Sequence, residues 1–226
     1  MYHPETIKIF KKLTNDLGNL KGYTIFKIGE ISINVTGRDG LGGLIEEWFG
    51  VWAKQTGFQI KNPKEEGKSQ EFPDFYIGKD NSLLEIKTFD ADRSPNFDLA
   101  NFESYCDSLA KTPERIDSDY LIFAYKLNGK NLSITNIWLK KIWEISCPSE
   151  RYPLKTQVKR NVIYNIRPAT WYSKNPQYKV FNNKEEFIEA LFETQRLYRG
   201  ESNKDLYLSK VKSLKEVLPI LTKRLL

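Results

Sequence analysis

The sequence contains too few histidines and cysteines for several kinds of chemistry. Its 226 residues include one His and two Cys, Cys106 and Cys147. Zinc sites draw their ligands mainly from Cys and His, and nucleophilic catalysis usually needs a His base. We therefore expect neither kind of site, nor a disulfide framework. A hydrolytic enzyme built from this chain would have to use carboxylates, lysine and a hard cation.

Long hydrophobic runs are also missing. No stretch approaches the roughly 18 consecutive apolar residues that span a bilayer, and residues 2–5 are polar where a secretory signal would need an apolar region. We expect no membrane association and a cytoplasmic location. Since 40% of the residues are hydrophobic and no Gly/Ser linker interrupts the chain, we expect a single domain over residues 1–226.

Acidic residues are absent from residues 151–184, which hold eight Lys or Arg residues. Residues 1–150 carry 19 Lys/Arg and 22 Asp/Glu, whereas residues 151–226 carry 16 and 7. Such a basic region favours a polyanion as partner, although a solvated basic face is the simpler alternative. Interleaved aromatic and amide side chains favour nucleic acid. The predicted DNA-binding residues are Lys155, Lys159, Arg160, Asn161, Asn165, Arg167 and Trp171.

The order of helix-like and strand-like segments predicts an α/β fold with a mixed central β-sheet flanked by helices. Apolar spacing indicates helices over about 5–20, 41–57, 97–110, after residue 183, and over 205–225. Alternating segments indicate strands over 23–28, 31–36, 75–77, 83–88, 120–126, 132–137 and 158–166. Turn residues join the first six of these strands into three hairpins. Residues 61–71 are expected to form a polar loop.

The residues that indicate chemistry are Pro73-Asp74 and, after ten intervening residues, Glu85-Ile86-Lys87. Alternate side chains of a strand share a face, so Glu85 and Lys87 point together. Two carboxylates and phosphate oxygens make the oxygen-rich shell that Mg²⁺ prefers, and the Ile86 carbonyl is a further candidate ligand. Lys87 could position the attacking water and stabilise charge on a phosphate.

Asp74 can join this group only in one pairing register of the 75–77/83–88 hairpin. Directly paired residues of an antiparallel ladder share a face. Asp74 must therefore pair with Glu85 or Lys87, or the strand must bulge near Pro73. In that arrangement we expect the carboxyl groups of Asp74 and Glu85 within roughly 3–6 Å of each other.

Pro73-Asp74 and Glu85-Ile86-Lys87 on a strand–turn–strand resemble the signature of PD-(D/E)XK nucleases. The upstream segment from Arg38 to Glu47, with Gly40 and Gly43, resembles the helix start of this superfamily, where a helix glutamate joins the site. The resemblance covers residues 38–90 as motif. It implies a catalytic core over about 38–140, with Asp74, Glu85, Lys87 and Glu47 as site residues. Glu46 is the rival of Glu47, and helical spacing does not separate them.

The resemblance further implies a Mg²⁺-dependent type II restriction endonuclease that cuts double-stranded DNA at a short specific sequence. Enzymes of this kind are usually homodimers, because a two-fold protein matches a palindromic site, and are accompanied by a separate DNA methyltransferase. Two alternatives remain open at this point. One is a repair or junction-resolving nuclease of the same fold, and the other is a DNA-binding module without activity.

Overall fold

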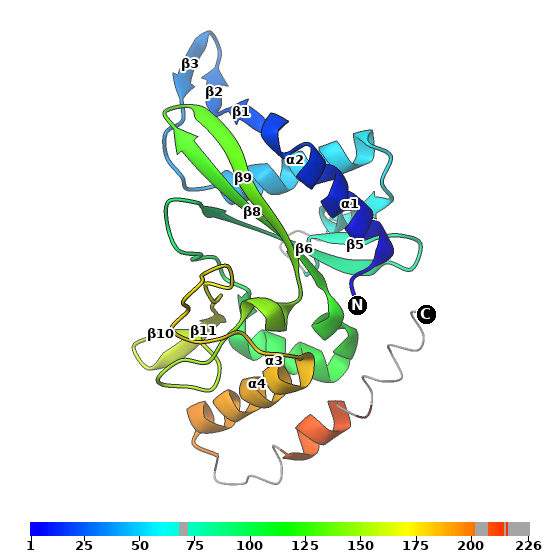
Figure 1. Cartoon of the computed structure of the whole chain (residues 1–226), viewed down its shortest axis with the longest axis vertical. Coiled ribbons are helices and arrows are strands. Elements are labelled where there is room, and N and C mark those ends of the chain that lie inside the picture. The colour runs from blue at the N-terminus through cyan, green and yellow to red at the C-terminus, as the bar shows by residue number, and fades with distance from the viewer. Residues whose placement is uncertain (68–71, 202–207, 215, 217–226) are drawn as a thin grey trace. The chain divides into compact units, whose positions relative to one another are not determined.

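The computed structural model describes residues 1–67, 72–201, 208–214 and 216, and it divides the chain into two compact units (Figure 1). Unit 1 contains Met1–Pro95 and Asp119–Lys140, and unit 2 contains Asn96–Ser118 and Lys141–Leu226. The chain passes between the units three times, so each unit is discontinuous in sequence. Such interleaving is compatible with a single folding domain over 1–226, which stays a prediction.

Unit 1 is built on a six-stranded sheet with the order β1-β9-β8-β6-β5-β4. Strands β6 and β8 are parallel, and every other neighbouring pair is antiparallel, so the sheet is mixed as predicted. Its strands are β1 (Lys21–Tyr23), β4 (Ile60–Lys61), β5 (Phe75–Ile77), β6 (Ser82–Asp90), β8 (Asp119–Asn128) and β9 (Asn131–Lys140). The predicted hairpins β5–β6 and β8–β9 are confirmed.

Two helices pack on the apolar residues of this sheet, α1 (Pro4–Asn15) and α2 (Leu41–Gln55). In α2, the ring of Phe49 lies 5.2 Å from that of Phe75 and 6.2 Å from that of Phe123. A Cβ added to Gly50 would lie 3.1 Å from the Phe75 ring, so the glycine allows the helix to approach β5 closely. In α1, Ile9 and Leu13 are fully buried in the same core.

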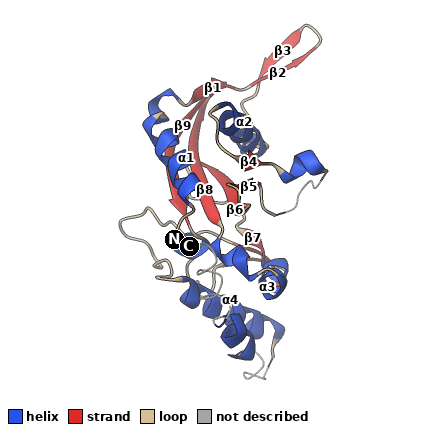
Figure 2. Cartoon of the chain, turned by 90° about the vertical axis from the view of Figure 1, so that its right-hand side faces the viewer, coloured by secondary structure: helices blue, strands red, loops and turns tan. Residues whose placement is uncertain are grey.

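A separate hairpin of β2 (Ile25–Ile28) and β3 (Ile31–Asn34) extends from β1, away from the sheet (Figure 2). The turn lies at Gly29-Glu30, as predicted. Short 3-10 helices cover Leu17–Asn19 and Pro63–Glu66. The predicted polar loop over 61–71 is thus partly structured, and its residues 68–71 lie outside the described ranges.

Unit 2 combines helices α3 (Phe102–Lys111) and α4 (Lys184–Arg199) with a three-stranded sheet of order β10-β11-β7. Its strands are β7 (Ala100–Asn101), β10 (Thr156–Lys159) and β11 (Val162–Ile166), and 3-10 helices cover Pro113–Asp117 and Ile142–Ile145. The predicted helix after residue 183 is α4, whose first turn is capped by the Asn183 side chain.

Two sequence predictions in unit 2 are wrong in detail. The helix predicted from residue 97 begins at Phe102, because residues 100–101 pair with β11 and the Asn101 side chain accepts the backbone N–H of Ser104 as an N-cap. The single strand predicted over 158–166 is a hairpin. Its turn residues Arg160 and Asn161 have φ of 50° and 63°, which a two-residue type I′ turn requires.

The last predicted helix, 205–225, lies partly outside the described residues, and within it residues 208–214 are helical. No helix in the described part of the chain is long and apolar enough to cross a membrane.

Candidate active site

The register of the β5–β6 hairpin brings Asp74 to the face of β6 that carries Glu85 and Lys87. Phe75 pairs with Leu84, Tyr76 with Leu83 and Ile77 with Ser82. Continued by one residue, the same register sets Asp74 opposite Glu85. This is one of the two registers that place Asp74 on the same face as Glu85 and Lys87, because directly opposed residues share a face.

The Asp74 carboxylate is held by the strand that it faces. Its Oδ2 accepts a hydrogen bond from the backbone N–H of Ile86 at 2.8 Å. Burial, and next the negative charge of Glu85, raise the pKa of Asp74 from 3.8 to about 6, against the opposing effects of Lys87 and of the Ile86 N–H. Asp74 and Glu85 therefore lie close enough to repel each other, which is the electrostatic condition of a cation site.

Lys87 supplies the positive charge of the group. Its Nζ lies 2.8 Å from Oε2 of Glu85, and the Glu85 side chain is 6% exposed. Burial lowers the pKa of Lys87, but the charges of Glu85 and Asp74 and the hydrogen bond to Glu85 outweigh it, so the net shift is upward. Lys87 is thus an ammonium in this arrangement, and it offsets part of the acidic charge.

The structure distinguishes the two glutamates of α2. Glu46 is partly buried and its Oε1 lies 2.7 Å from Nζ of Lys64, whereas Glu47 is exposed. The charge of Glu46 also acts on Lys87 and raises its pKa. Glu46 therefore faces the group formed by Asp74, Glu85 and Lys87.

Lys64, in the 3-10 helix over Pro63–Glu66, is a member of this site that the sequence analysis missed. The hydrogen bond that it donates to Glu46 raises the pKa of Lys64, and the charges of Asp74 and Glu47 act in the same direction. Nothing in the sequence distinguished Lys64 from the other charged residues of the polar stretch, because its role depends on the distance between this turn and α2.

An ion pair joins the segment just before α2 to the end of β6. Nε of Arg38 lies 2.7 Å from Oδ2 of Asp90, which is 6% exposed. Gly40, with φ of 83°, is the N-cap residue of α2. This contact fixes the helix that carries Glu46 relative to the strand that carries Glu85, which gives Arg38 and Gly40 of the motif a structural role.

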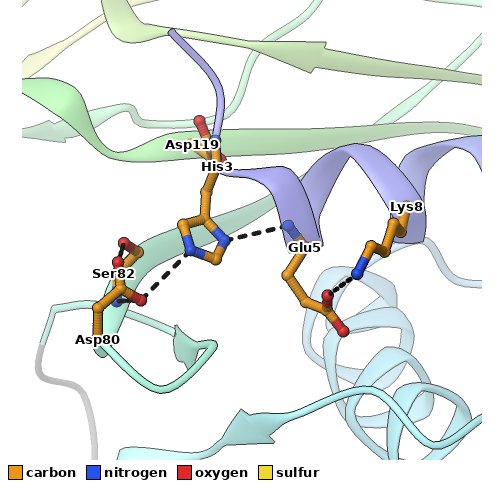
Figure 3. A network of polar contacts seen from close by, with 6 residues as sticks. All are labelled: His3, Glu5, Lys8, Asp80, Ser82 and Asp119. Carbon is orange, nitrogen blue, oxygen red and sulfur yellow. Dashed lines mark hydrogen bonds and ion pairs between the residues drawn. The ribbon is translucent and has the colours of Figure 1, made fainter. Parts of the chain in front are cut away.

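The only histidine of the chain, His3, anchors the other side of the β5–β6 hairpin (Figure 3). Its Nε2 lies 3.3 Å from Oδ1 of Asp80 in the β5–β6 turn, and its Nδ1 accepts the backbone N–H of Glu5. The backbone N–H of His3 donates to Oδ2 of Asp119, the first residue of β8. The N-terminus of α1 thereby connects the hairpin to the neighbouring strand. The sequence showed no sign of this role, because the contacts are distant along the chain.

The oxygen ligands at this site suit Mg²⁺ better than a metal that prefers Cys or His ligands, or one that needs three or more protein side chains. In the described part of the chain, no three His, Cys, Asp or Glu side chains are grouped so that they could hold a metal ion. Asp74 and Glu85 are two hard oxygen donors, and Ile86, whose backbone N–H donates to Asp74, lies between Glu85 and Lys87 in the sequence. Mg²⁺ is commonly held by one or two carboxylates, with water and substrate phosphate completing its octahedron.

The predicted DNA-binding residues fall into two groups. Four of them make contacts inside unit 2. Lys155 Nζ donates to the Pro168 carbonyl at 2.9 Å, Arg167 Nη1 lies 2.5 Å from Oδ1 of Asp98, and Asn165 donates to the side chain of Gln157. Trp171 is half-buried, with its ring 6.2 Å from that of Phe97.

The other three predicted residues lie at the tip of the β10–β11 hairpin. Lys159, Arg160 and Asn161 are all exposed. Lys159 Nζ lies 5.9 Å from the centroid of the exposed Tyr164 ring. The tip therefore offers basic, amide and aromatic groups to solvent together, which is a suitable combination for a nucleic acid surface.

Comparison with known proteins gives consistent matches over most of the chain. A family model described as NgoBV restriction endonuclease matches residues 4–216. The type II restriction enzyme NlaIV of Neisseria lactamica is 34% identical over 194 residues, which cover 83% of this chain and 79% of that protein. The type II restriction enzyme NgoBV of Neisseria gonorrhoeae is 29% identical over 160 residues, covering 68% and 89%. A solved structure of NlaIV restriction endonuclease superposes with a TM-score of 0.81 at 33% identity, covering 93% of this chain and 87% of that one.

Proposed function

The chain belongs to the NgoBV restriction endonuclease family, whose members are nucleases of the PD-(D/E)XK type, and it is a type II restriction endonuclease that cleaves DNA at a specific site; from this premise we propose that Asp74, Glu85 and Lys87 are its catalytic residues. Family membership sets aside a repair or junction-resolving nuclease and an inactive DNA-binding module. The observation that carries the residue assignment is the β5–β6 register, in which Phe75 pairs with Leu84, so that one further residue sets Asp74 opposite Glu85.

We propose Mg²⁺ as the cofactor, held by the carboxylates of Asp74 and Glu85 and by the Ile86 carbonyl. When bound, the ion would neutralise charge on the scissile phosphate and lower the pKa of a bound water. The chain's own groups have complementary roles. Lys87 is held as an ammonium beside Glu85, where it can orient the attacking water and stabilise the phosphate charge that develops.

Of the two glutamates of α2, we propose Glu46 as the one that joins the site, in place of the Glu47 assignment that the motif suggested. Glu46 acts electrostatically on Lys87, and it is already engaged by Lys64. Glu47 is exposed on the same helix and serves as the alternative.

For DNA contact we propose the β10–β11 hairpin tip, with Lys159, Arg160 and Asn161 nearest the DNA. Lys155, Asn165, Arg167 and Trp171 then support the hairpin, since their described contacts are internal to unit 2. We further propose that the enzyme acts on double-stranded DNA as a homodimer, since the described residues of one chain form one such catalytic group and a two-fold dimer supplies one for each strand. A cognate DNA methyltransferase and a cytoplasmic location stay predictions.

The test combines cleavage with a metal-binding measurement. Wild-type protein with Mg²⁺ should convert plasmid to discrete fragments, and Asp74→Ala or Glu85→Gln should abolish this. Isothermal titration with Mg²⁺ should detect binding in the wild type and a loss of at least tenfold in affinity in either variant, because each removes one of two carboxylate ligands. Residual cleavage above about 10% of wild type in both variants would refute the assignment, given how much charge a metal neutralises.

Asp98→Asn is a suitable control for these variants. This variant removes a carboxylate in unit 2. The Asp98 side chain is 49% exposed and forms an ion pair with Arg167. The variant should leave both Mg²⁺ affinity and cleavage within about twofold of wild type, as a surface charge change usually does.

A further inference from the structure

The β2–β3 hairpin has one apolar face and one polar face. Phe26 pairs with Ile33 and Ile28 pairs with Ile31 across the two strands. Because paired residues share a face and side chains alternate along a strand, these four residues form one surface, which we call the hairpin apolar face. The opposite face carries Ile25 with Asn34 and Lys27 with Ser32.

The hairpin apolar face is exposed to solvent. Its four side chains are exposed by 53% for Phe26, 69% for Ile28, 74% for Ile31 and 55% for Ile33. Four side chains of this size expose on the order of 400 Å², a level at which apolar patches on soluble proteins mark interaction sites. An isolated two-stranded hairpin is at best marginally stable in water, so this one needs a packing partner.

The base of the hairpin is firmly attached to unit 1. Thr24 is 8% exposed, and its backbone N–H donates to the Lys130 carbonyl at 2.8 Å. Its hydroxyl donates to the Val35 carbonyl at 2.6 Å, while the backbone N–H of Val35 donates to the Thr24 carbonyl. The hairpin is therefore held in place as it extends beyond β1, as both views show (Figures 1 and 2).

We propose that the hairpin apolar face is the self-association surface of the enzyme, where it packs against the same face of a second copy. This proposal rests on the homodimer proposed above and names its contact surface. In an isologous contact, the same patch of both copies meets. The hairpin apolar face suits such a contact, because both of its cross-strand pairs consist of large apolar side chains that would face the same kind of side chain on the second copy.

Charge and area favour a second copy over DNA. The hairpin apolar face carries no charged residue, whereas a DNA surface needs cations for the phosphates. The charged residues of the hairpin, Lys27 and Glu30, pair with each other at 3.6 Å. Two facing patches bury on the order of 800 Å² in total. This is about two thirds of the roughly 1,200 Å² at which specific interfaces begin, so the hairpin apolar face would form the apolar centre of a larger contact.

Sedimentation velocity of the full-length protein, without metal or DNA, tests the proposal. The wild type should be a dimer at micromolar concentration. Phe26→Thr with Ile31→Thr should raise the dimer Kd on the order of 1,000-fold, since four large side chains, two from each copy, no longer leave water on association. Threonine keeps a high strand propensity, which protects the hairpin itself. Ile25→Thr is the matched control, because Ile25 is 53% exposed like Phe26 but lies on the opposite face, and it should remain dimeric.

Cysteine cross-linking supports the assignment without perturbing the apolar face. The two native cysteines are buried. Ile28→Cys should form a covalent dimer with a short bismaleimide reagent, and Ile25→Cys should do so at least tenfold more slowly. This experiment remains decisive if the double threonine variant fails to fold, as judged by circular dichroism.

A wild type that stays monomeric up to about 100 µM, or a double variant that folds and dimerises like the wild type, would overturn the proposal. So would variants that keep their oligomeric state but lose DNA affinity, since this would assign the face to DNA. These outcomes are separate from those of the catalytic proposal, because Asp74→Ala should lose Mg²⁺ binding and still sediment as a dimer. A monomeric Phe26/Ile31 variant should conversely keep the Mg²⁺ affinity of the wild type.

Discussion

The Asp74 carboxylate accepts the backbone N–H of Ile86, the residue between Glu85 and Lys87, with 2.8 Å between oxygen and nitrogen. This single contact ties the residue before β5 to the middle of the motif on β6. It also keeps Asp74 partly buried next to another carboxylate, where the ionised form is unfavourable. The ionised Asp74 carboxylate therefore destabilises the metal-free protein, and the free energy of unfolding measures this effect.

Asp74→Asn should stabilise the metal-free protein at neutral pH. The pKa of Asp74 is raised from 3.8 to about 6, so its contribution to stability is fully present below about pH 4 and is lost as the pH rises through 6. At pH 7.5 the asparagine variant should gain up to about 3 kcal/mol in the free energy of unfolding, and at pH 3.5 almost nothing. Urea unfolding in EDTA measures this.

The exposed Asp92, whose pKa is lowered by its hydrogen bond with Lys126, provides a control for that measurement. Asp92→Asn should not stabilise the protein at pH 7.5. If Asp74→Asn were no more stable than the wild type at this pH, the ionised form of Asp74 would not be destabilised by burial and by Glu85.

Glu46→Gln and Glu47→Gln should differ strongly in cleavage rate. Glu46 acts on Lys87 and contacts Lys64, whereas Glu47 is exposed. We expect Glu46→Gln to lower the single-turnover rate by about 100-fold, which is typical for the loss of one preorganised charged group, and Glu47→Gln to change it by less than about threefold. Wild-type rates in both variants would show that the helix contributes no glutamate to catalysis, and a larger loss for Glu47→Gln would restore Glu47 as the site residue.

The two groups of predicted DNA-binding residues should respond differently to substitution. Lys159→Ala and Arg160→Ala should weaken DNA binding, and each should reduce the slope of log K against log salt by about one, provided that each residue meets one phosphate. Arg167→Ala should instead lower the free energy of unfolding by up to about 1 kcal/mol, because its ion pair with Asp98 is partly exposed. Fluorescence anisotropy over a salt series and urea unfolding separate these effects. An unchanged salt slope in both tip variants would argue against the hairpin tip.

His3→Ala should lower the stability of unit 1. His3 caps α1 through the Glu5 N–H and contacts Asp80 in the β5–β6 turn. We expect a loss of about 1 kcal/mol in the free energy of unfolding, as for other N-cap substitutions. His3→Asn retains a side chain that can cap the helix but is too short to reach Asp80, so it should recover part of the loss. Full recovery would mean that the Asp80 contact adds no stability.

The sequence by itself determined the parts of the site that depend on local periodicity. Glu85 and Lys87 share a face because side chains alternate along any strand, and Pro73-Asp74 lies one turn away in the chain. The mixed α/β fold, the β5–β6 and β8–β9 hairpins and α2 likewise follow from the period of apolar residues and from turn chemistry. These properties involve residues that are close in the chain.

Only the tertiary structure decided which of several locally equivalent residues faces the site. Glu46 and Glu47 are neighbours on one helix, and the Arg38–Asp90 ion pair and the close approach at Gly50 help to set which of them faces β6. The register that aligns Asp74 with Glu85 depends on strand pairing, and a slip of one residue would have reversed its face. The exposure of Phe26, Ile28, Ile31 and Ile33 was equally invisible in the sequence, because an alternating strand predicts an apolar face but not what covers it.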